Sequence, residues 1–486
     1  MVDGSGGARR PLRTSRRRRP VAAHRGPRGR CADPRHPRAR RRHRRRQRPG
    51  TRFRAPLAPG VDTLGPHAHS DHVAFRRWGQ CRHSPPPTPH PGFVKLWIVG
   101  ARGSIATTLA AGVLAAQRGL APLEALLTET EAFVGLGLAA LPAIDIGGCD
   151  LAPGTLAQSA HAALAGVGTF PVAMIDALMP DLERIAITRG VLRGGGAAID
   201  ALAGDQRAAT ASGTAREVVD RLVTDIRAFA QDEPTVVVNL ASTEPTPAAA
   251  LADWDGAALR RAVDDDDPRI PSSCLYALAA IEAGCPHANF TPSAGASLPA
   301  IVELARAAGV PLAGRDGKTG ETLLKTALAP MFPIRALTVE GWYGTNILGN
   351  TDGLVLADPD NKASKITSKK GVLEGILGYA PEGDVRIDYF KPLADHKVAW
   401  NFIQFRGWGG HRMRMQFTWE GTDSVLAAPL VLDIARLALL AQRRGESGPI
   451  GALGLFFKTP EGSSEMNLYK QYDALLRWTS GRSAAG

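Results

Sequence analysis

The sequence predicts an α/β protein built on a doubly wound parallel sheet, preceded by a long arm that takes no part in the fold. Apolar runs of strand length alternate with helical stretches from residue 93 onward, as in open sheets covered by helices on both faces. A glycine-containing turn joins the first apolar run to its helix. Residues 1–92, in contrast, have the composition of a chain that builds no core.

The predicted arm, residues 1–92, carries the basic excess of the chain. It holds 24 arginines, no lysine and four aspartates, a net charge of +20, whereas residues 93–486 sum to −7 and the whole chain to +13. With 14 of the 36 prolines and few apolar residues, it buries too little surface to offset its chain entropy, so we expect disorder. Three interpretations stay open: a tail for nucleic acid or anionic membranes, a transit peptide, or translation from a start codon placed too far upstream.

The remainder of the chain has the composition of a large globular protein from a reducing compartment. Its mild acidity predicts no nucleic-acid partner. The five cysteines of the chain show no CxxC pair, which argues against a disulfide framework and a cysteine-based zinc site, and no metal ligands are predicted. No apolar run reaches the ~18 residues of a membrane span, and the N-terminus lacks a signal-peptide core. A cytoplasmic protein without a membrane partner is expected.

The first predicted elements have the order of a dinucleotide-binding unit. Phe93–Val99 is an apolar strand, a turn beginning at Gly100 follows, and Thr107–Arg118 is an Ala- and Leu-rich helix. Glycines let backbone N–H groups approach a pyrophosphate at the helix N-terminus. An ordinary strand-to-helix turn has the same pattern. The candidate cofactor contacts of this turn are Gly100, Arg102, Gly103, Ser104 and Ile105.

An acidic partner for the cofactor ribose is expected further on. Glu124 and Glu129 lie near the usual distance but in a helix-like stretch, so Asp150 or Asp145, around the glycine pair of 144–150, fits better. That stretch is also compatible with a turn capped by an aspartate. Thr235–Asn239 is a further buried strand, and Ser242 and Thr243 follow its end, where open α/β sheets bind ligands.

The second half of the chain alternates between polar loops and further elements. Its expected features are a helix at Ser272–Ala283, a strand at His287–Pro292, a Gly-rich loop opening a helix at Gly314–Thr322, a turn at Asn350–Gly353, and strands at Asp384–Tyr389, Val398–Phe405 and Met413–Thr418. Lys365 and Lys369 are four apart and share one face of a helix. The pair Asp423-Ser424 is expected to cap a helix at Val425–Arg443, and Gly454–Pro460 is expected to be an apolar strand. Lys458 near its end is either partly desolvated, with a lowered pKa, or a lysine that reaches solvent.

Taken in order over residues 93–480, these segments resemble the myo-inositol-1-phosphate synthase (inositol-3-phosphate synthase) family. The family's GDDxKSGQT loop is similar to Gly314–Thr322, with Arg315 in place of the first Asp, and its NxDG turn matches Asn350–Gly353. The other matching segments are SKxxSK at residues 364–369, GDSK at 394–397, DS-xxx-APL at 423–430, FKxP at 457–460, GG-x-D at 147–150 and TANTE at 240–244.

The resemblance implies an NAD-dependent, redox-neutral conversion of D-glucose 6-phosphate to 1D-myo-inositol 3-phosphate, in inositol and phosphatidylinositol biosynthesis. By this resemblance the catalytic lysines are Lys365, for proton transfer in the redox steps, and Lys458, for enolisation and cyclisation. Lys369 and Lys397 would hold phosphate and oxyanions. The polar residues expected around the nicotinamide and the substrate are Asp316, Asn350, Asp352, Asp395, Asp423 and Ser424.

The family architecture implies a homotetramer and a division of the chain into segments. After the arm at 1–92, residues 93–329 would form a Rossmann NAD-binding domain and 330–420 a central α/β domain for catalysis and tetramerisation. Residues 421–486 would return to the Rossmann domain. Arg315, His396 and the turn sequence GARGSIA depart from the family pattern. A related cyclase acting on another hexose phosphate, and a plain NAD(P) dehydrogenase, therefore remain alternatives.

Overall fold

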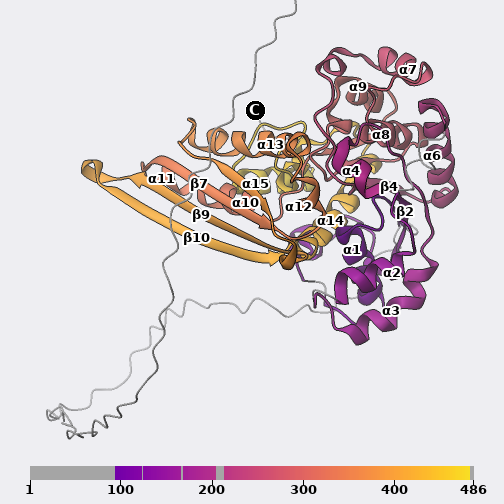
Figure 1. Cartoon of the computed structure of the whole chain (residues 1–486), viewed down its shortest axis with the longest axis horizontal. Helices are drawn as coiled ribbons and strands as arrows, with labels where there is room; N and C mark the ends of the chain where they lie inside the picture. Colours follow the sequence, from indigo (N-terminus) through magenta and orange to yellow (C-terminus); the bar gives the residue numbers. More distant parts are fainter. Residues whose placement is uncertain (1–93, 123, 166–167, 204–212, 482–486) are drawn as a thin grey trace, which may run out of the picture. The chain divides into compact units, whose positions relative to one another are not determined.

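Seven parallel strands form the main sheet, in the order β11-β6-β5-β4-β1-β2-β3. The computed structural model describes residues 94–122, 124–165, 168–203 and 213–481, with no side-chain description for Ala165, Ala296 and 362–370 (Figure 1). The arm predicted for residues 1–92 lies outside the described residues. The strands are β1 Val94–Val99, β2 Ile144–Asp150, β3 Ile187–Arg189, β4 Thr235–Asn239, β5 His287–Asn289, β6 Pro311–Gly314 and β11 Gly448–Pro449.

The strand order confirms the predicted doubly wound sheet. The chain runs outward from β1 to β3 and then restarts on the other side of β1 with β4, β5 and β6, so the switch point lies between β1 and β4. Both strands are buried along their whole length, which explains their continuous apolar runs. The strand predicted at Thr235–Asn239 and the helix predicted at Ser272–Ala283 are confirmed to the residue.

Helices cover both faces of this sheet. Leu96, Ile98 and Val236 pack with α1, α3 and α14 on one face, and Trp97 and Val237 pack with α6, α7, α8 and α9 on the other. The helices are α1 Ser104–Gln117, α2 Leu156–Ala160, α3 Val172–Arg184, α4 Gly196–Ala203, α6 Ala215–Ala230, α7 Gly256–Asp264, α8 Ser272–Ala283, α9 Pro299–Ala307, α10 Glu321–Leu328, α11 Met331–Ile334, α12 Thr351–Val355, α13 Pro359–Leu377, α14 Asp423–Arg443 and α15 Leu468–Thr479.

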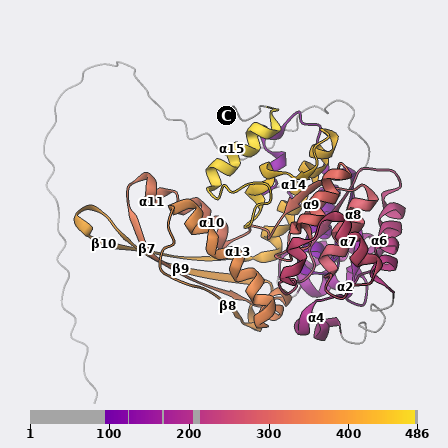
Figure 2. The same cartoon turned by 90° about the horizontal axis from the view of Figure 1, so that it is seen from above.

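A second sheet of four strands lies between β6 and β11 in the chain. Its strands are β7 Thr338–Leu348, β8 Val385–Tyr389, β9 His396–Arg406 and β10 Arg412–Thr422, in the order β10-β9-β7-β8. One face packs on α10, α11 and α13 (Figure 2). There Phe332 contacts Trp342 and Phe405 through edge-on ring contacts. The period-two pattern of the predicted strands arises because their other face is only partly covered.

The C-terminal part of the chain returns to the first sheet. After β10, helix α14 packs on α1 and β11 pairs with β6. Within the described part of the chain, α14 is the one helix with the length and apolar composition of a membrane span, and 78% of that stretch is buried in the fold. The strands of the first sheet lie within residues 94–314 and at 448–449, and those of the second sheet lie within residues 338–422. The domain boundaries themselves stay a prediction.

Three local predictions are wrong. Residues 451–456 form a 3-10 helix, not part of a strand, and Phe457 makes only an isolated bridge to Gly317. Thr422, not Asp423, precedes α14, and it makes no side-chain cap. The expected turn at Asn350 is a helix start, because the Asn350 carboxamide oxygen accepts from the Gly353 N–H at 3.1 Å. Strand β7, with its internal glycines, was not predicted.

Candidate active site

A cavity of about 680 Å³ lies where the carboxyl ends of β1, β2, β4 and β5 face the loops around the second sheet. Most of the side chains predicted from sequence gather around it. Those that line it are Gly100, Arg102, Gly103, Ser104, Ile105, Asp150, Ser242, Thr243, Asp316, Asn350, Asp352, Lys397, Asp423 and Lys458. Asp395 and Ser424 do not line the cavity. Asp395 accepts from the amide of Asn350, a lining residue, and Ser424 donates its N–H to Asp395 and directly follows the lining residue Asp423.

The turn after β1 brings backbone N–H groups to the cavity. Gly100 has φ +80°, and a Cβ there would lie 2.8 Å from the backbone of Ala241, so only glycine fits. Gly103 precedes α1, and no side chain caps the helix. The first N–H groups of α1 are therefore available to an anion, and the helix dipole favours one there.

The two aspartates of β2 lie at opposite ends of the strand. Asp150 accepts from the Arg102 N–H at 2.6 Å and from the Ala152 N–H at 2.7 Å, so its carboxylate joins the glycine turn to the end of β2. Asp145 pairs with Lys95 at 3.9 Å, away from this cavity. Geometry therefore favours Asp150 over Asp145 as the ribose acceptor.

The loop after β4 is held by a buried carboxylate. Glu244 accepts from the Ser273 N–H at 3.0 Å and from the Ser273 hydroxyl. Burial raises the pKa of Glu244 to about 7, although these hydrogen bonds lower it. Asn361, fully buried at the start of α13, donates to the Thr243 carbonyl at 2.7 Å. This contact docks the first turn of α13 on the loop that lines the cavity.

A buried ion pair joins the Gly-rich loop to the C-terminal segment. The Lys458 Nζ lies 2.6 Å from the Asp316 Oδ1, and the two side chains are 7% and 4% exposed. The Lys458 N–H also donates to the Asp316 carbonyl at 2.7 Å. Asp316 has φ +62°, a left-handed backbone that turns its carboxylate and carbonyl toward Lys458. An ammonium group held this way in a buried site interacts strongly with any nearby anion.

A second lysine–aspartate pair lies on the other wall. The Lys397 Nζ is 3.4 Å from the Asp423 Oδ1, which also accepts from the Thr319 hydroxyl at 3.2 Å. Behind it, Asp395 accepts from the Asn350 amide at 3.2 Å and from the Ser424 N–H at 3.2 Å. Burial raises the pKa of Asp395, against the hydrogen bonds from Ser424 and Asn350 that lower it.

Lys365 and Lys369 lie on α13, so the prediction that they share one helix is confirmed for the backbone. Their side chains lie outside the described residues. The docking of Asn361 places the first turn of this helix at the cavity, with Lys365 about one turn further along.

Sequence reasoning missed several lining residues. Leu192, Ile199 and Leu202 form an apolar wall of the same cavity that Asp150 lines, suited to a flat aromatic ring. The run Gly194-Gly195-Gly196 was the available signal, since Gly196 has φ +80° and a Cβ there would lie 2.8 Å from Pro245. Together the apolar wall, Asp150 and the uncapped helix α1 fit the adenosine and pyrophosphate of a dinucleotide.

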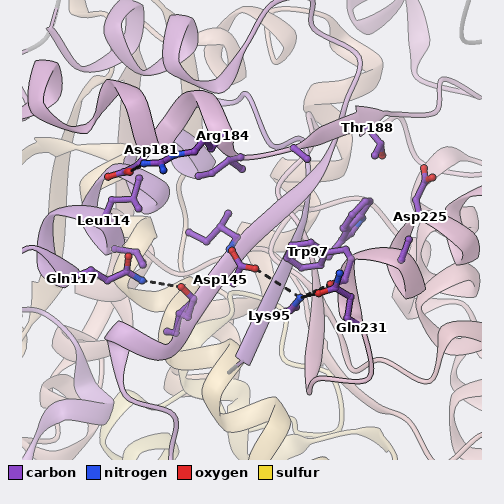
Figure 3. A pocket seen from close by; sticks show the side chains of 17 residues that line it. Lys95, Trp97, Leu114, Gln117, Asp145, Asp181, Arg184, Thr188, Asp225 and Gln231 are labelled. Carbon is purple, nitrogen blue, oxygen red and sulfur yellow. Dashed lines mark hydrogen bonds and ion pairs between the residues drawn. The ribbon is translucent and has the colours of Figure 1, made fainter. Parts of the chain in front are cut away.

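A second cavity, of about 670 Å³, lies beside the amino-terminal halves of β1 and β2 (Figure 3). Several of its polar side chains bond to the protein itself, whereas the Trp97 Nε1 and the Thr188 Oγ1 have no hydrogen-bond partner among the described residues. The Lys95 Nζ donates to the Phe229 carbonyl at 2.8 Å and to Gln231 at 3.1 Å, and Gln117 donates to the Ile144 carbonyl at 2.9 Å. Of the predicted cofactor and catalytic residues within the described chain, only Asp145, the less favoured ribose candidate, lines this cavity.

Comparisons with known proteins agree with the geometry. Residues 130–479 match the family model described as myo-inositol-1-phosphate synthase, an NAD-binding family. The chain is 34% identical to inositol-3-phosphate synthase 1 of Bacteroides thetaiotaomicron over 80% of this chain and 94% of the relative. It is 33% identical to isozyme 1 of Arabidopsis thaliana over 48% of each chain.

Two solved structures share the fold. Inositol-3-phosphate synthase of Caenorhabditis elegans has a TM-score of 0.73 at 22% identity, over 81% of this chain and 86% of that one. A myo-inositol-1-phosphate synthase-related protein of Thermotoga maritima has a TM-score of 0.65 at 23% identity, over 80% and 98%. The predictions of an enzyme of this kind with NAD as its cofactor are confirmed, and the chain belongs to the myo-inositol-1-phosphate synthase family.

Proposed function

We propose that this chain converts D-glucose 6-phosphate to 1D-myo-inositol 3-phosphate, a redox-neutral isomerisation that supplies inositol and phosphatidylinositol biosynthesis. One observation carries the proposal: a single cavity joins a dinucleotide cradle at α1 to two lysine–aspartate pairs, Lys458 with Asp316 and Lys397 with Asp423. A sugar phosphate is a dianion, and further negative charge develops when the C5 ketone formed from it enolises. Fixed ammonium groups stabilise both.

The cradle would hold NAD through α1, Gly103 and Asp150. When bound, NAD supplies reversible acceptance of hydride from C5 of the substrate. Lys365 moves the proton of the C5 hydroxyl. Once C5 is a ketone, its neighbour C6 is acidic, and Lys458 assists removal of that proton and the attack of C6 on the C1 aldehyde.

The remaining polar residues hold the substrate and orient the lysines. Lys397 and Lys369 bind phosphate and oxyanions. Asp316 fixes the direction of the Lys458 ammonium at 2.6 Å, and Asp423 fixes Lys397 at 3.4 Å. Asn350 contacts the substrate from the start of α12, backed by Asp395, and Asp352 lies two residues further on, by the nicotinamide.

The decisive experiment is incubation of the purified protein with NAD and glucose 6-phosphate. We expect inositol phosphate to form while the absorbance of NADH stays flat. Accumulating NADH would instead identify a plain dehydrogenase. Absence of any product from enzyme loaded with NAD would refute the proposed substrate.

A related cyclase of another hexose phosphate is favoured by one observation. Glu321 stands at the glutamine of the GDDxKSGQT motif, is 2% exposed, pairs with Lys325 at 2.8 Å and accepts from Asn346 at 2.6 Å. Glu321 places a carboxylate instead of an amide near the end of the Gly-rich loop, and Arg315 places a guanidinium instead of a carboxylate near its start. Both substitutions change the charge of that loop. Offering the enzyme fructose, mannose and galactose 6-phosphates beside glucose 6-phosphate decides between the substrates.

We further propose a cytoplasmic homotetramer. Tyr343, Trp400 and Phe402 lie side by side on the partly exposed face of the second sheet, with ring centroids 6.2 Å apart in each neighbouring pair. Such an aromatic stripe is a suitable interface between copies. The three buried free cysteines Cys149, Cys274 and Cys285 suit a reducing compartment. Sedimentation of wild type and Trp400→Glu tests the assembly; a monomeric wild type would contradict it.

A further inference from the structure

Lys318 is a buried lysine that the proposed reaction does not use. Its neighbours Asp316, Gly317 and Thr319 line the cavity, whereas Lys318 does not. Its side chain extends to the C-terminal helix α15, where the Nζ donates to the Gln471 Oε1 at 2.5 Å, and Lys318 is 3% exposed. Its own N–H donates to the Phe456 carbonyl at 2.8 Å. The Gly-rich loop is thus fixed to the C-terminal segment on the side away from the cavity.

Gln471 is built to accept this hydrogen bond. It is also 3% exposed, and its Nε2 donates to the Glu465 carbonyl at 2.6 Å. That bond fixes the orientation of the carboxamide, so that its oxygen faces the amine. Lys318, Gln471 and the Glu465 carbonyl form a short buried chain of hydrogen bonds between the loop and α15.

The amine has no carboxylate partner among the described residues. The charged groups on the elements around it pair with one another: Asp316 with Lys458, Glu321 with Lys325, and Glu465 with Lys470. The other charged groups on these elements, none of which bonds to Lys318, are Arg315, Glu461, Asp473 and Arg477. Burial alone lowers the pKa of Lys318 to about 7, because nothing offsets its desolvation.

We propose that Lys318 is a positioning residue: through Gln471, helix α15 holds the loop that presents Asp316 and Thr319 to the reacting substrate. On one side of Lys318 the loop carries Asp316, which pairs with Lys458. On the other side it carries Thr319, whose hydroxyl donates to Asp423. A loop that loses this attachment lets both pairs shift. The measurement of turnover described below rests on the proposed function, whereas the measurements of stability against pH and of NADH fluorescence do not.

The first test replaces the amine and keeps the apolar packing. In Lys318→Met we expect kcat to fall about tenfold to a hundredfold, the effect of a misplacement on the order of 1 Å, with KM and NAD affinity within about threefold of wild type. The matched control is Lys470→Met on α15, a lysine whose side chain is 68% exposed, which should leave kcat unchanged. A wild-type kcat in Lys318→Met would overturn the proposal.

The second test gives the amine a counter-charge. The pKa of Lys318 is about 7 in the folded protein and 10.5 in its ordinary state. Between these values the unfolded chain binds one more proton at this amine, so the contribution of Lys318 to the free energy of unfolding rises with pH from 7 to 10.5. In Gln471→Glu the carboxylate raises the pKa of Lys318, so we expect the thermal midpoint of the variant to rise less, or fall more, with pH over this range than that of wild type, while kcat at pH 7 stays within about threefold. An unchanged slope, or a kcat as low as that of Lys318→Met, would refute the role of the pair.

These readouts separate the two proposals. If the wild type forms no product from glucose 6-phosphate, the proposed function fails, whereas the pH slope still reports on Lys318. In that case the loop is followed by the fluorescence of bound NADH. We expect Lys318→Met to shift that fluorescence and Lys470→Met to leave it unchanged; no shift in Lys318→Met would overturn the inference.

Discussion

The two edges of the seven-stranded sheet carry cavities of almost equal volume, about 680 Å³ at the carboxyl edge and about 670 Å³ at the amino edge. Cavity size therefore does not identify the site. At the carboxyl edge, segments from residue 100 to residue 458 converge, and buried lysines face aspartates. At the amino edge, Lys95 bonds to protein acceptors (Figure 3). The side chain of Asp145 there is 54% exposed.

The largest expected difference between the edges is catalytic. Lys458→Gln should reduce turnover about a thousandfold, because it removes the ammonium that assists proton removal. It also leaves Asp316 buried without this partner, at a cost of about 3–5 kcal/mol in unfolding free energy. Product formation and urea unfolding measure the two effects. Asp316→Asn combined with Lys458→Gln should recover part of the stability and none of the turnover; turnover near wild type in either variant would contradict the assignment.

The two aspartates of β2 provide a matched pair across the sheet. Asp150→Ala removes the acceptor of two backbone N–H groups and the expected ribose contact, so NAD affinity should fall about tenfold to a hundredfold. Asp145→Ala, five residues away on the same strand, should leave NAD affinity unchanged. Calorimetric titration with NAD measures both affinities. Equal effects of the two substitutions would contradict the assignment of the NAD site to the carboxyl edge.

Two glycines of the first βα unit differ in the space that surrounds them: Gly100 lies against neighbouring backbone, whereas Gly112 has room for a side chain. Gly100→Ala should cost about 1–3 kcal/mol of unfolding free energy, because φ is +80° and the Cβ would meet Ala241. In Gly112→Ala, within α1, the added Cβ meets nothing within 4 Å, and we expect a gain of about 0.5–1 kcal/mol. Urea midpoints measure both. A neutral Gly100→Ala would show that the turn relaxes freely.

The smallest effect is expected at the amino edge. Lys95→Met leaves the Phe229 carbonyl and Gln231 without their donor, at a cost of about 1 kcal/mol. Turnover and NAD affinity should not change. A fall in turnover with an almost unchanged thermal midpoint would contradict this prediction and would show that the amino-edge cavity affects the reaction.

Sequence reasoning succeeded where the determinant of structure is local. Thr235–Asn239 is buried on both faces, so its composition alone predicts a strand, and Asp150 and Asp316, which follow from short motifs close to the ends of β2 and β6, line the cavity. It failed where a distant partner decides. Residues 451–456 are apolar enough for a strand, yet they wind into a 3-10 helix against α15.

The missed contacts have the same cause. Asn361 appears in sequence as an ordinary polar residue near a helix start, and only the fold reveals that it is buried against Thr243. Lys318 lies in a recognisable motif, but its direction depends on a helix about 150 residues later in the chain. The role of each lysine on α13 stays a prediction.

The return of the C-terminal segment has a consequence for biosynthesis. Residues 94–314 contain six of the seven strands of the first sheet and the nucleotide cradle, and they leave the ribosome early. Lys458, β11 and Gln471 emerge last. A chain that ends before residue 423 therefore lacks α14, which covers one face of the first sheet, as well as the Lys458 ammonium and helix α15. The complete lining of the cavity exists only once the C-terminal segment has been made.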